Sequence, residues 1–178
     1  MDNLALYILD LVQNSIEAKA EHIRVDMVET HQLCLTIKDD GCGMSEENVA
    51  KAMSPFYTTR KTRKVGMGLS LIKMLAEQTE GNFSLTSTLN QGTELKVCFN
   101  HHHMDMPQMG NLGEMIMMIA IHPQVKHFDF HYTNAPKAYQ FDLDAIRTMF
   151  QDTLMDHEVM QGLIQYINQE IDIVRGRL

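Results

Sequence analysis

The sequence predicts a two-layer α/β (α+β) sandwich, in which helices cover one face of a mixed β-sheet. Two observations support this fold class. In some segments apolar residues recur at helical spacing, and in others they alternate with polar residues as in half-buried strands. The two kinds of segment follow one another in the order αββααββ over about residues 1–100. Such an order favours helices on one side of a single sheet.

The first half of this unit is a helix, two strands and a short helix. Residues 1–20 have apolar residues at helical spacing, and neither Gly nor Pro interrupts them. Strands are predicted at residues 23–28 and 33–37, where apolar and polar residues alternate and β-branched residues are frequent. A turn at residues 40–43 then leads to a short helix that Ser45 caps.

The second half contains a loop, a helix and a hairpin. Residues 55–65 are polar and basic without periodicity, so we expect a mobile loop there. Residues 66–80 are predicted to be helical, and Gly81 ends this helix. Residues 83–87 and 93–99 are predicted to pair as a hairpin.

A change in composition over residues 101–111, which carry three histidines, Pro107 and Gly110, marks a predicted linker. It separates a domain at residues 1–100 from a small α+β C-terminal region at residues 112–178. In that region we expect a buried helix at 112–121, a hairpin formed by 127–132 and 139–141, and helices at 143–150 and 157–174.

Composition argues against several classes of protein. The chain has 178 residues, of which 44% are hydrophobic and 21% charged, as in a globular protein. The longest apolar stretch, residues 115–121, is far shorter than the roughly twenty residues of a membrane span, and no signal peptide is recognisable. The net charge of −8 argues against general nucleic-acid binding. The three scattered cysteines favour reduced thiols in a cytoplasm over a disulfide framework.

The first candidate for chemistry is the pair Asp10 and Asn14, which share one face of the first helix. A carboxylate can orient or deprotonate a water molecule, and a neutral amide oxygen can bind Mg²⁺. The alternative is that both residues simply belong to the solvated side of an amphipathic helix.

The second candidate is the stretch from Asp39 to Met44, directly after a predicted strand. Gly41 and Gly43 would let the backbone approach a flat ligand, and the Asp39 carboxylate can accept a hydrogen bond from an exocyclic amine. The alternative is an ordinary Asp-Gly turn between a strand and a helix.

The third candidate is a basic loop at residues 58–65 that leads into Gly66-Met67-Gly68 at the start of a helix. Backbone amides, the positive end of the helix dipole and basic side chains would converge there on phosphates. The spacing is not that of a Walker loop, and one Gly-x-Gly is weak evidence alone.

Together, the order and spacing of these segments resemble the motif set of the GHKL superfamily, which includes DNA gyrase, heat-shock chaperone ATPases, histidine kinases and mismatch-repair ATPases. The resemblance covers about residues 1–100 and implies the Bergerat ATP-binding fold, with ATP held under a flexible lid. The first motif looks like the mismatch-repair and chaperone branch, and the lid and Gly-x-Gly motifs look like histidine kinases. The matching segments are residues 10–18, 39–44, 55–59, 66–70 and 92–93.

The resemblance implies a role for each matching residue. Asn14 would bind Mg²⁺, and Asp39 would bind the adenine amine with support from Thr93 through water. The other nucleotide contacts would be Gly41 and Gly43 at the adenine, Gly66 and Gly68 at the phosphates, Met44, Met67 and Leu69 within the same motifs, and Thr58, Thr59, Arg60, Lys61, Arg63 and Lys64 in the lid.

Asp10 departs from the family pattern, because the hydrolysing branches have Glu there as the general base. Asp is one methylene shorter, so we expect inefficient water activation and unimpaired ATP binding.

The leading hypothesis is therefore a cytoplasmic Mg²⁺- and ATP-binding protein with slow, lid-gated hydrolysis, similar to small stand-alone bacterial members of the superfamily. Two alternatives stay open: an ATP-dependent protein kinase of the histidine-kinase or anti-sigma-factor type, and a non-catalytic module that ATP switches between binding states. We expect a protein partner at the C-terminal region, no nucleic acid or membrane partner, and a monomer or weak dimer.

Three further features have simpler explanations. His157 and Glu158 resemble the start of a phosphoacceptor motif but fit a solvated helix N-terminus better. The histidines at 101–103 could bind a metal, but a polar linker explains them more simply. The methionines at 115, 117 and 118 suggest an adaptable core, with a partner-binding groove as the alternative.

Overall fold

The computed structural model describes residues 3–52 and 68–178, and these residues form a six-stranded sheet with the strand order β3-β4-β2-β1-β5-β6. The elements are α1 (Leu4–Glu17), β1 (His22–Glu29), β2 (Leu33–Asp39), α2 (Glu46–Ala52), α3 (Gly68–Gln78), β3 (Asn82–Thr88), β4 (Gly92–Phe99), α4 (Leu112–Ala120), β5 (His127–Asn134), β6 (Lys137–Asp142), α5 (Leu143–Phe150), the 3₁₀ helix η1 (Gln151–Met155) and α6 (His157–Arg175).

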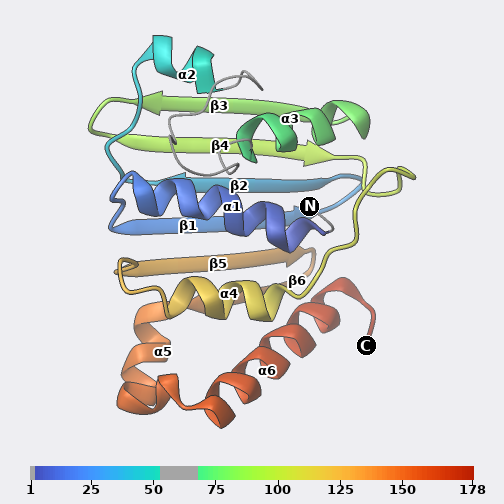
Figure 1. Cartoon of the computed structure of the whole chain (residues 1–178). Coiled ribbons are helices and arrows are strands. Elements are labelled where there is room, and N and C mark those ends of the chain that lie inside the picture. The colour runs from blue at the N-terminus through green and yellow to red at the C-terminus, as the bar shows by residue number, and fades with distance from the viewer. Residues whose placement is uncertain (1–2, 53–67) are drawn as a thin grey trace.

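The sheet is mixed, as predicted. β1 pairs with β2, β2 with β4, β4 with β3, and β5 with β6, all antiparallel, whereas β1 and β5 are parallel. Figure 1 shows α1, α3 and α4 over one face of this sheet. The predicted fold class, a sheet with helices on one face, is thus confirmed.

Alternation along the strands explains why only one face is covered. Val25, Leu35 and Phe130 are completely buried beneath the helices, while Arg24 and Lys38 on the other face are exposed. A strand with apolar residues at every second position can bury only one of its faces. The helices therefore pack on that face, and the polar face stays in contact with solvent.

The C-terminal region extends the same sheet. β5 lies parallel to β1 with Ile23 opposite Phe128 and Val25 opposite Phe130, so β5 and β6 continue the sheet past β1. One cluster of buried apolar residues runs from α1 to α6 without interruption. Residues 101–111 are also tied to the first helix, because the backbone N–H of Leu4 donates to the carbonyl of Gln108 at 2.8 Å. The domain boundary in this segment stays a prediction.

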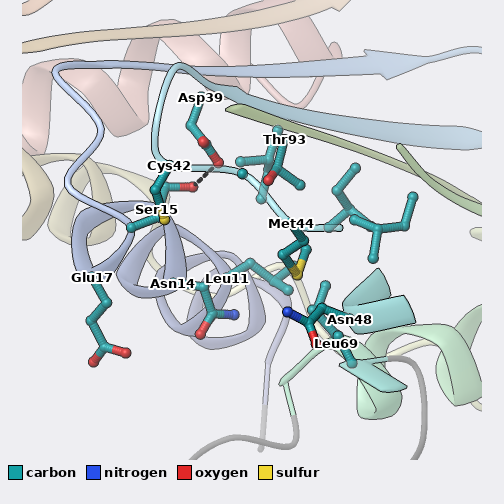
Figure 2. A pocket seen from close by; sticks show the side chains of 16 residues that line it. Leu11, Asn14, Ser15, Glu17, Asp39, Cys42, Met44, Asn48, Leu69 and Thr93 are labelled. Carbon is teal, nitrogen blue, oxygen red and sulfur yellow. Dashed lines mark hydrogen bonds between the residues drawn. The ribbon is translucent and has the colours of Figure 1, made fainter. Parts of the chain in front are cut away.

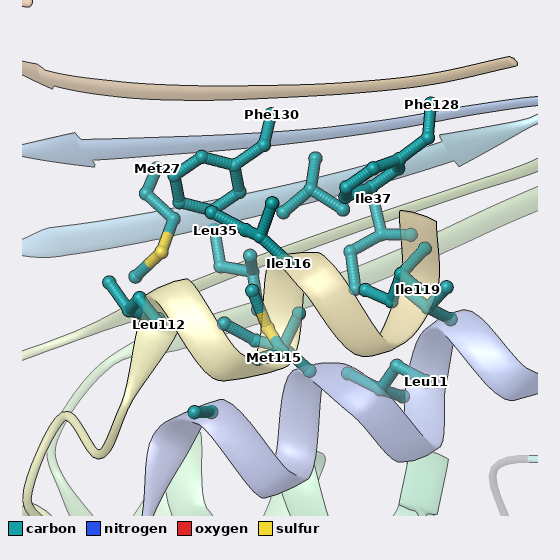
Figure 3. Close-up of a cluster of buried hydrophobic side chains, with 14 of the residues drawn as sticks. Leu11, Met27, Leu35, Ile37, Leu112, Met115, Ile116, Ile119, Phe128 and Phe130 are labelled. Atoms are coloured by element: carbon teal, nitrogen blue, oxygen red, sulfur yellow. The ribbon is translucent and has the colours of Figure 1, made fainter. Parts of the chain in front are cut away.

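Helix α4 joins the two parts of the chain by its packing. Figure 3 shows Ile116 directed towards the strands and Met115 between α4 and α1. Ile116 is fully buried, Met115 and Met117 nearly so, and Met118 is 50% exposed. Burial of each such side chain stabilises the fold by about 1.5–3 kcal/mol. The first two of the three methionines are core residues, as predicted.

The expectation of three reduced cysteines is wrong for two of them. Cys34 of β2 and Cys98 of β4 form a disulfide, and only Cys42, which is exposed, is a free thiol. The two paired cysteines are 64 residues apart in the sequence but lie directly opposite each other across two neighbouring strands, with 4.0 Å between their Cα atoms. Their scattered positions in the chain concealed this proximity. In the part of the chain that the structure describes, no helix has both the length and the apolar character needed to cross a membrane.

Candidate functional site

A cavity of about 400 Å³ opens between α1, the turn after β2, α2, the start of α3, and strands β3 and β4. Its volume lies within the usual range for ligand pockets. Six of the sequence-predicted site residues line it together, although they come from four separate segments of the chain. These are Asn14, Asp39, Gly43, Met44, Leu69 and Thr93.

Asp39 lies at the end of β2 and is only 8% exposed. A buried carboxylate is stable only if hydrogen bonds replace its lost hydration. Here the Ser15 hydroxyl donates to Oδ2 at 2.7 Å (Figure 2), and the backbone N–H of Gly41 donates to Oδ1 at 2.9 Å. The carboxylate is thereby held in one orientation, and each oxygen keeps further acceptor capacity for a ligand.

Ser15 is a site residue that the sequence reasoning missed. It is 4% exposed and follows Asn14 directly on α1. A small polar residue among the buried positions of an amphipathic helix was the available signal, because such a residue needs a buried partner.

The turn after Asp39 is held by the elements on both sides of it. The backbone N–H of Cys42 donates to the carbonyl of Ala18 at 2.9 Å, and a Cβ on Gly41 would come within 2.8 Å of the Ala18 Cβ. Gly43 has a φ of +61°, and a Cβ there would lie 2.0 Å from the carbonyl oxygen of Thr88. Both glycines are therefore required by packing within the protein. Gly43 also lines the cavity, and contact of either glycine with an adenine remains a prediction.

Asp40 anchors the same turn to the start of β1. Its Oδ1 accepts hydrogen bonds from the backbone N–H groups of Glu21 at 2.7 Å and His22 at 2.9 Å, and its Oδ2 lies 2.9 Å from His22 Nδ1. Partial burial by itself would raise the pKa of Asp40. The hydrogen bonds from His22 and Glu21 outweigh it, so the pKa is lowered. An ionised Asp40 therefore stabilises the turn that follows Asp39.

Thr93 and Met44 are connected through a second residue that the sequence reasoning missed, Ser87 of β3. The backbone N–H of Met44 donates to Ser87 Oγ at 2.8 Å, and Ser87 Oγ lies 2.9 Å from Thr93 Oγ1. Nothing in the local sequence of β3 distinguishes Ser87 from the other hydroxyl residues of that strand. Its role follows from the pairing of β3 with β4.

Asn14 and Asp10 have different positions relative to the cavity. Asn14 lines it, as does Glu17 one turn further along α1. Asp10 is not among the lining residues, and its carboxylate lies against the first residue of α3. A Cβ on Gly68 would come within 2.2 Å of Asp10 Oδ2. The structure thus places the Asp10 carboxylate at the N-terminal end of α3, which carries a partial positive charge.

The residues of the described segments contain no group of three or more His, Cys, Asp or Glu side chains that could hold a metal ion. Mg²⁺ does not need such a group, because it commonly keeps several waters and takes its other ligands from substrate phosphates. A single amide oxygen at the cavity, that of Asn14, fits this manner of binding.

The remaining predicted contacts lie outside the described residues, so their positions stay predictions. They are Thr58, Thr59, Arg60, Lys61, Arg63, Lys64, Gly66 and Met67.

Comparison with known proteins agrees with this geometry. Residues 2–103 match the model of the family described as histidine kinase-, DNA gyrase B-, and HSP90-like ATPase. The chain belongs to this family, and the resemblance to the GHKL superfamily is confirmed. Its family-matching part is an ATP-binding domain.

Two bacterial proteins show the extent of the sequence likeness. A putative sensor protein of Shewanella frigidimarina is 31% identical, over 52% of this chain and 15% of its own length. Sporulation kinase A of Bacillus subtilis is 30% identical, over 51% of this chain and 15% of its own length. The chain therefore corresponds to a small part of these relatives.

A solved structure, the N-terminal domain of a DNA repair protein, superposes with a TM-score of 0.57 at 16% identity. The likeness covers 87% of this chain and 59% of that one. At this identity the comparison shows a shared fold, and its coverage extends beyond the part of the chain that matches the family model.

Proposed function

We propose that the protein binds ATP with Mg²⁺ in the cavity between α1 and the turn after β2, and that it hydrolyses ATP slowly. The observation that carries this proposal is the buried Asp39 carboxylate, which Ser15 and Gly41 hold at the cavity wall. An ionised carboxylate only accepts hydrogen bonds. It therefore favours a ligand that presents an N–H group, such as the amino group of adenine.

Asn14 would hold the Mg²⁺. Its amide oxygen would be the protein's ligand to the ion, and water and the phosphates would supply the others. Bound there, the ion would neutralise negative charge on the phosphates. Because Asn14 and Asp39 line the same cavity, the two residues could hold opposite ends of one nucleotide.

Asp10 is the residue that we propose as the general base, and its position supports slow turnover. A general base must come within roughly 2.6–3.2 Å of the group it deprotonates. The carboxylate of Asp10 lies beside Gly68, next to the helix end where the phosphates are expected. The missing methylene holds it back from that point compared with a glutamate.

Single-turnover hydrolysis of ATP with excess protein tests this function. We expect slow hydrolysis by the parent, an increase on the order of tenfold to a hundredfold for Asp10→Glu, and a loss of activity for Asp10→Asn. Calorimetric ATP affinities measured on the same preparations control for binding and should be nearly unchanged. If both substitutions leave turnover unaltered, Asp10 is not a base. If the parent binds no ATP, the proposed function is wrong.

Phosphate transfer to a partner protein is the second candidate function. The likeness to sporulation kinase A favours it, since that protein's name describes a kinase. ATP labelled in the γ-phosphate would distinguish the two functions. Hydrolysis releases the label as inorganic phosphate, whereas a kinase leaves it covalently attached to a second protein in a cell extract.

We place the partner-binding surface on the C-terminal region. Several large apolar side chains are exposed there, among them Met149 (73%) on α5, Met155 (63%) on η1 and Tyr166 (55%) on α6. The elements that carry them are consecutive in the chain, and α5 and α6 both contact η1; apolar groups that gather on one surface favour interaction. Replacing Met155 and Tyr166 by Glu should weaken transfer of label to a partner, with ATP binding unchanged. Equal transfer by this double variant would exclude the surface.

A further inference from the structure

Three hydroxyl or carboxyl side chains form one row across the sheet at the wall of the cavity. Asp39 of β2 is directly opposite Thr93 of β4, and Thr93 is directly opposite Ser87 of β3. Opposite residues on neighbouring strands point to the same face, which here is the face that the helices cover. Asp39 and Thr93 line the cavity, and Ser87 stands behind Thr93.

The contacts of Ser87 determine where the hydroxyl hydrogens of the row can point. Ser87 Oγ accepts the backbone N–H of Met44 at 2.8 Å and lies 3.0 Å from the carbonyl oxygen of Gly92, to which it donates. A serine hydroxyl has one hydrogen, and that hydrogen is used by Gly92. The remaining contact, 2.9 Å to Thr93 Oγ1, is then satisfied only if Thr93 donates to Ser87.

Thr93 consequently turns its hydrogen away from the cavity and presents only lone pairs to it. Asp39 likewise presents only lone pairs. A purine with an amino group at C6 carries two N–H donors and matches such a wall. A purine with a carbonyl at C6 places an acceptor against acceptors, and buried polar groups left unpaired in this manner are costly.

We propose that Ser87 is a specificity-determining residue, which selects 6-aminopurine over 6-oxopurine nucleotides by holding Thr93 as an acceptor. Ser87 is a positioning residue in this scheme, since Thr93 lies between it and the ligand. The proposal rests on the proposed function, because it concerns the same nucleotide cavity.

The test compares the affinities for ATP and inosine triphosphate, whose bases differ at C6 and N1, by calorimetry. The parent should prefer ATP. In Ser87→Ala the Thr93 hydroxyl can rotate and donate to a 6-carbonyl. The ratio of the affinity for ATP to the affinity for inosine triphosphate should therefore fall by about fivefold to tenfold, the equivalent of one neutral hydrogen bond. Ser84→Ala is the matched control, because Ser84 lies on the same strand and is exposed. Its ratio should equal that of the parent.

A loss of packing alone would weaken both nucleotides equally and leave the ratio unchanged, which would overturn the proposal. Thr93→Val should reduce the ratio as well, and adding Ser87→Ala to it should reduce the ratio no further, because Ser87 acts through Thr93. Additive effects would contradict that mechanism. Should Ser87→Ala fail to fold, Ser87→Thr, which keeps the hydroxyl, must keep the preference for ATP, and Thr93→Val must reduce it.

Failure of this proposal is distinguishable from failure of the proposed function. If the parent binds neither nucleotide, the cavity is not a nucleotide site. If it binds ATP and inosine triphosphate equally well, the contact of Asp39 with the 6-amino group is refuted together with the role of Ser87. If it prefers ATP and Ser87→Ala keeps that preference, only the role of Ser87 is refuted.

Discussion

Replacing Asp39 by Asn tests the predicted contact with adenine while leaving the shape of the side chain unchanged. Asp39 Oδ1 accepts the N–H of Gly41 at 2.9 Å, so this position must remain an oxygen in the variant. The amide nitrogen then takes the place of Oδ2, where Ser15 Oγ at 2.7 Å can accept from it instead of donating. Both internal hydrogen bonds survive, and we expect the fold to be retained.

The substitution removes the hydrogen bond that the Asp39 carboxylate would accept from the nucleotide. A hydrogen bond to a charged group contributes about 1.5–3 kcal/mol, so its removal alone lowers ATP affinity by roughly tenfold to 150-fold. The new N–H group would also face the amino group of adenine, donor against donor. We therefore expect binding to fall below detection by calorimetry.

Glu94→Gln is the control for the change in charge. Glu94 neighbours Thr93 on β4 but pairs with Lys96 on the solvent-facing side of the sheet. It should bind ATP as the parent does. An Asp39→Asn affinity within twofold of the parent would remove Asp39 from the adenine site and refute the reasoning.

Three further predictions concern the metal, the general base and the far end of the sheet. Asn14→Ala should weaken ATP binding in Mg²⁺ far more than in a chelator, because only a metal ligand is lost; equal weakening in calorimetry would make Asn14 a packing residue. Gly68→Ala should slow single-turnover hydrolysis, since its Cβ would meet Asp10 Oδ2 at 2.2 Å and displace that carboxylate; an unchanged rate would show that the position of Asp10 is unimportant. Burial and then the hydrogen bond to Glu29 raise the pKa of Tyr132 well above its usual range. The neutral phenol therefore contributes stability below about pH 10 that is lost as the pH rises further. Melting temperatures should fall less steeply above about pH 10 in Tyr132→Phe than in the parent, and parallel curves would contradict this linkage.

Short-range patterns predicted the elements of the fold well. The alternation in β1 and β2 and the helical spacing in α1 and α4 are properties of neighbouring residues, and they depend on burial of one side of an element. The structure confirms these elements, as well as the hairpin of β5 and β6. The same patterns cannot specify which element covers a buried side. The parallel pairing of β5 with β1 is an example, because the sequence of β5 has the alternation of a strand whether or not that strand pairs with β1.

The residues of the candidate site likewise fall into two groups, those that local sequence patterns identify and those that only the structure identifies. Asn14, Asp39 and Thr93 could be found from the sequence, because each belongs to a motif of fixed local spacing. Ser87 could not, since its importance lies in a partner on another element, and for Ser15 the helix pattern offered a buried polar position but did not identify its partner. The local sequence does not show which buried carboxylate or hydroxyl a serine will contact in the folded protein.

The sequence by itself determined the family, the order of helices and strands, and the residue types that a nucleotide site needs. These follow from local spacing and from chemistry that each side chain carries with it. Only the tertiary structure decided the register of β2, β4 and β3. That register brings Asp39, Thr93 and Ser87 into one row and joins Cys34 to Cys98. Contacts of this kind depend on how strands distant in the chain align, and the alignment is set by the packing of the whole sheet against its helices.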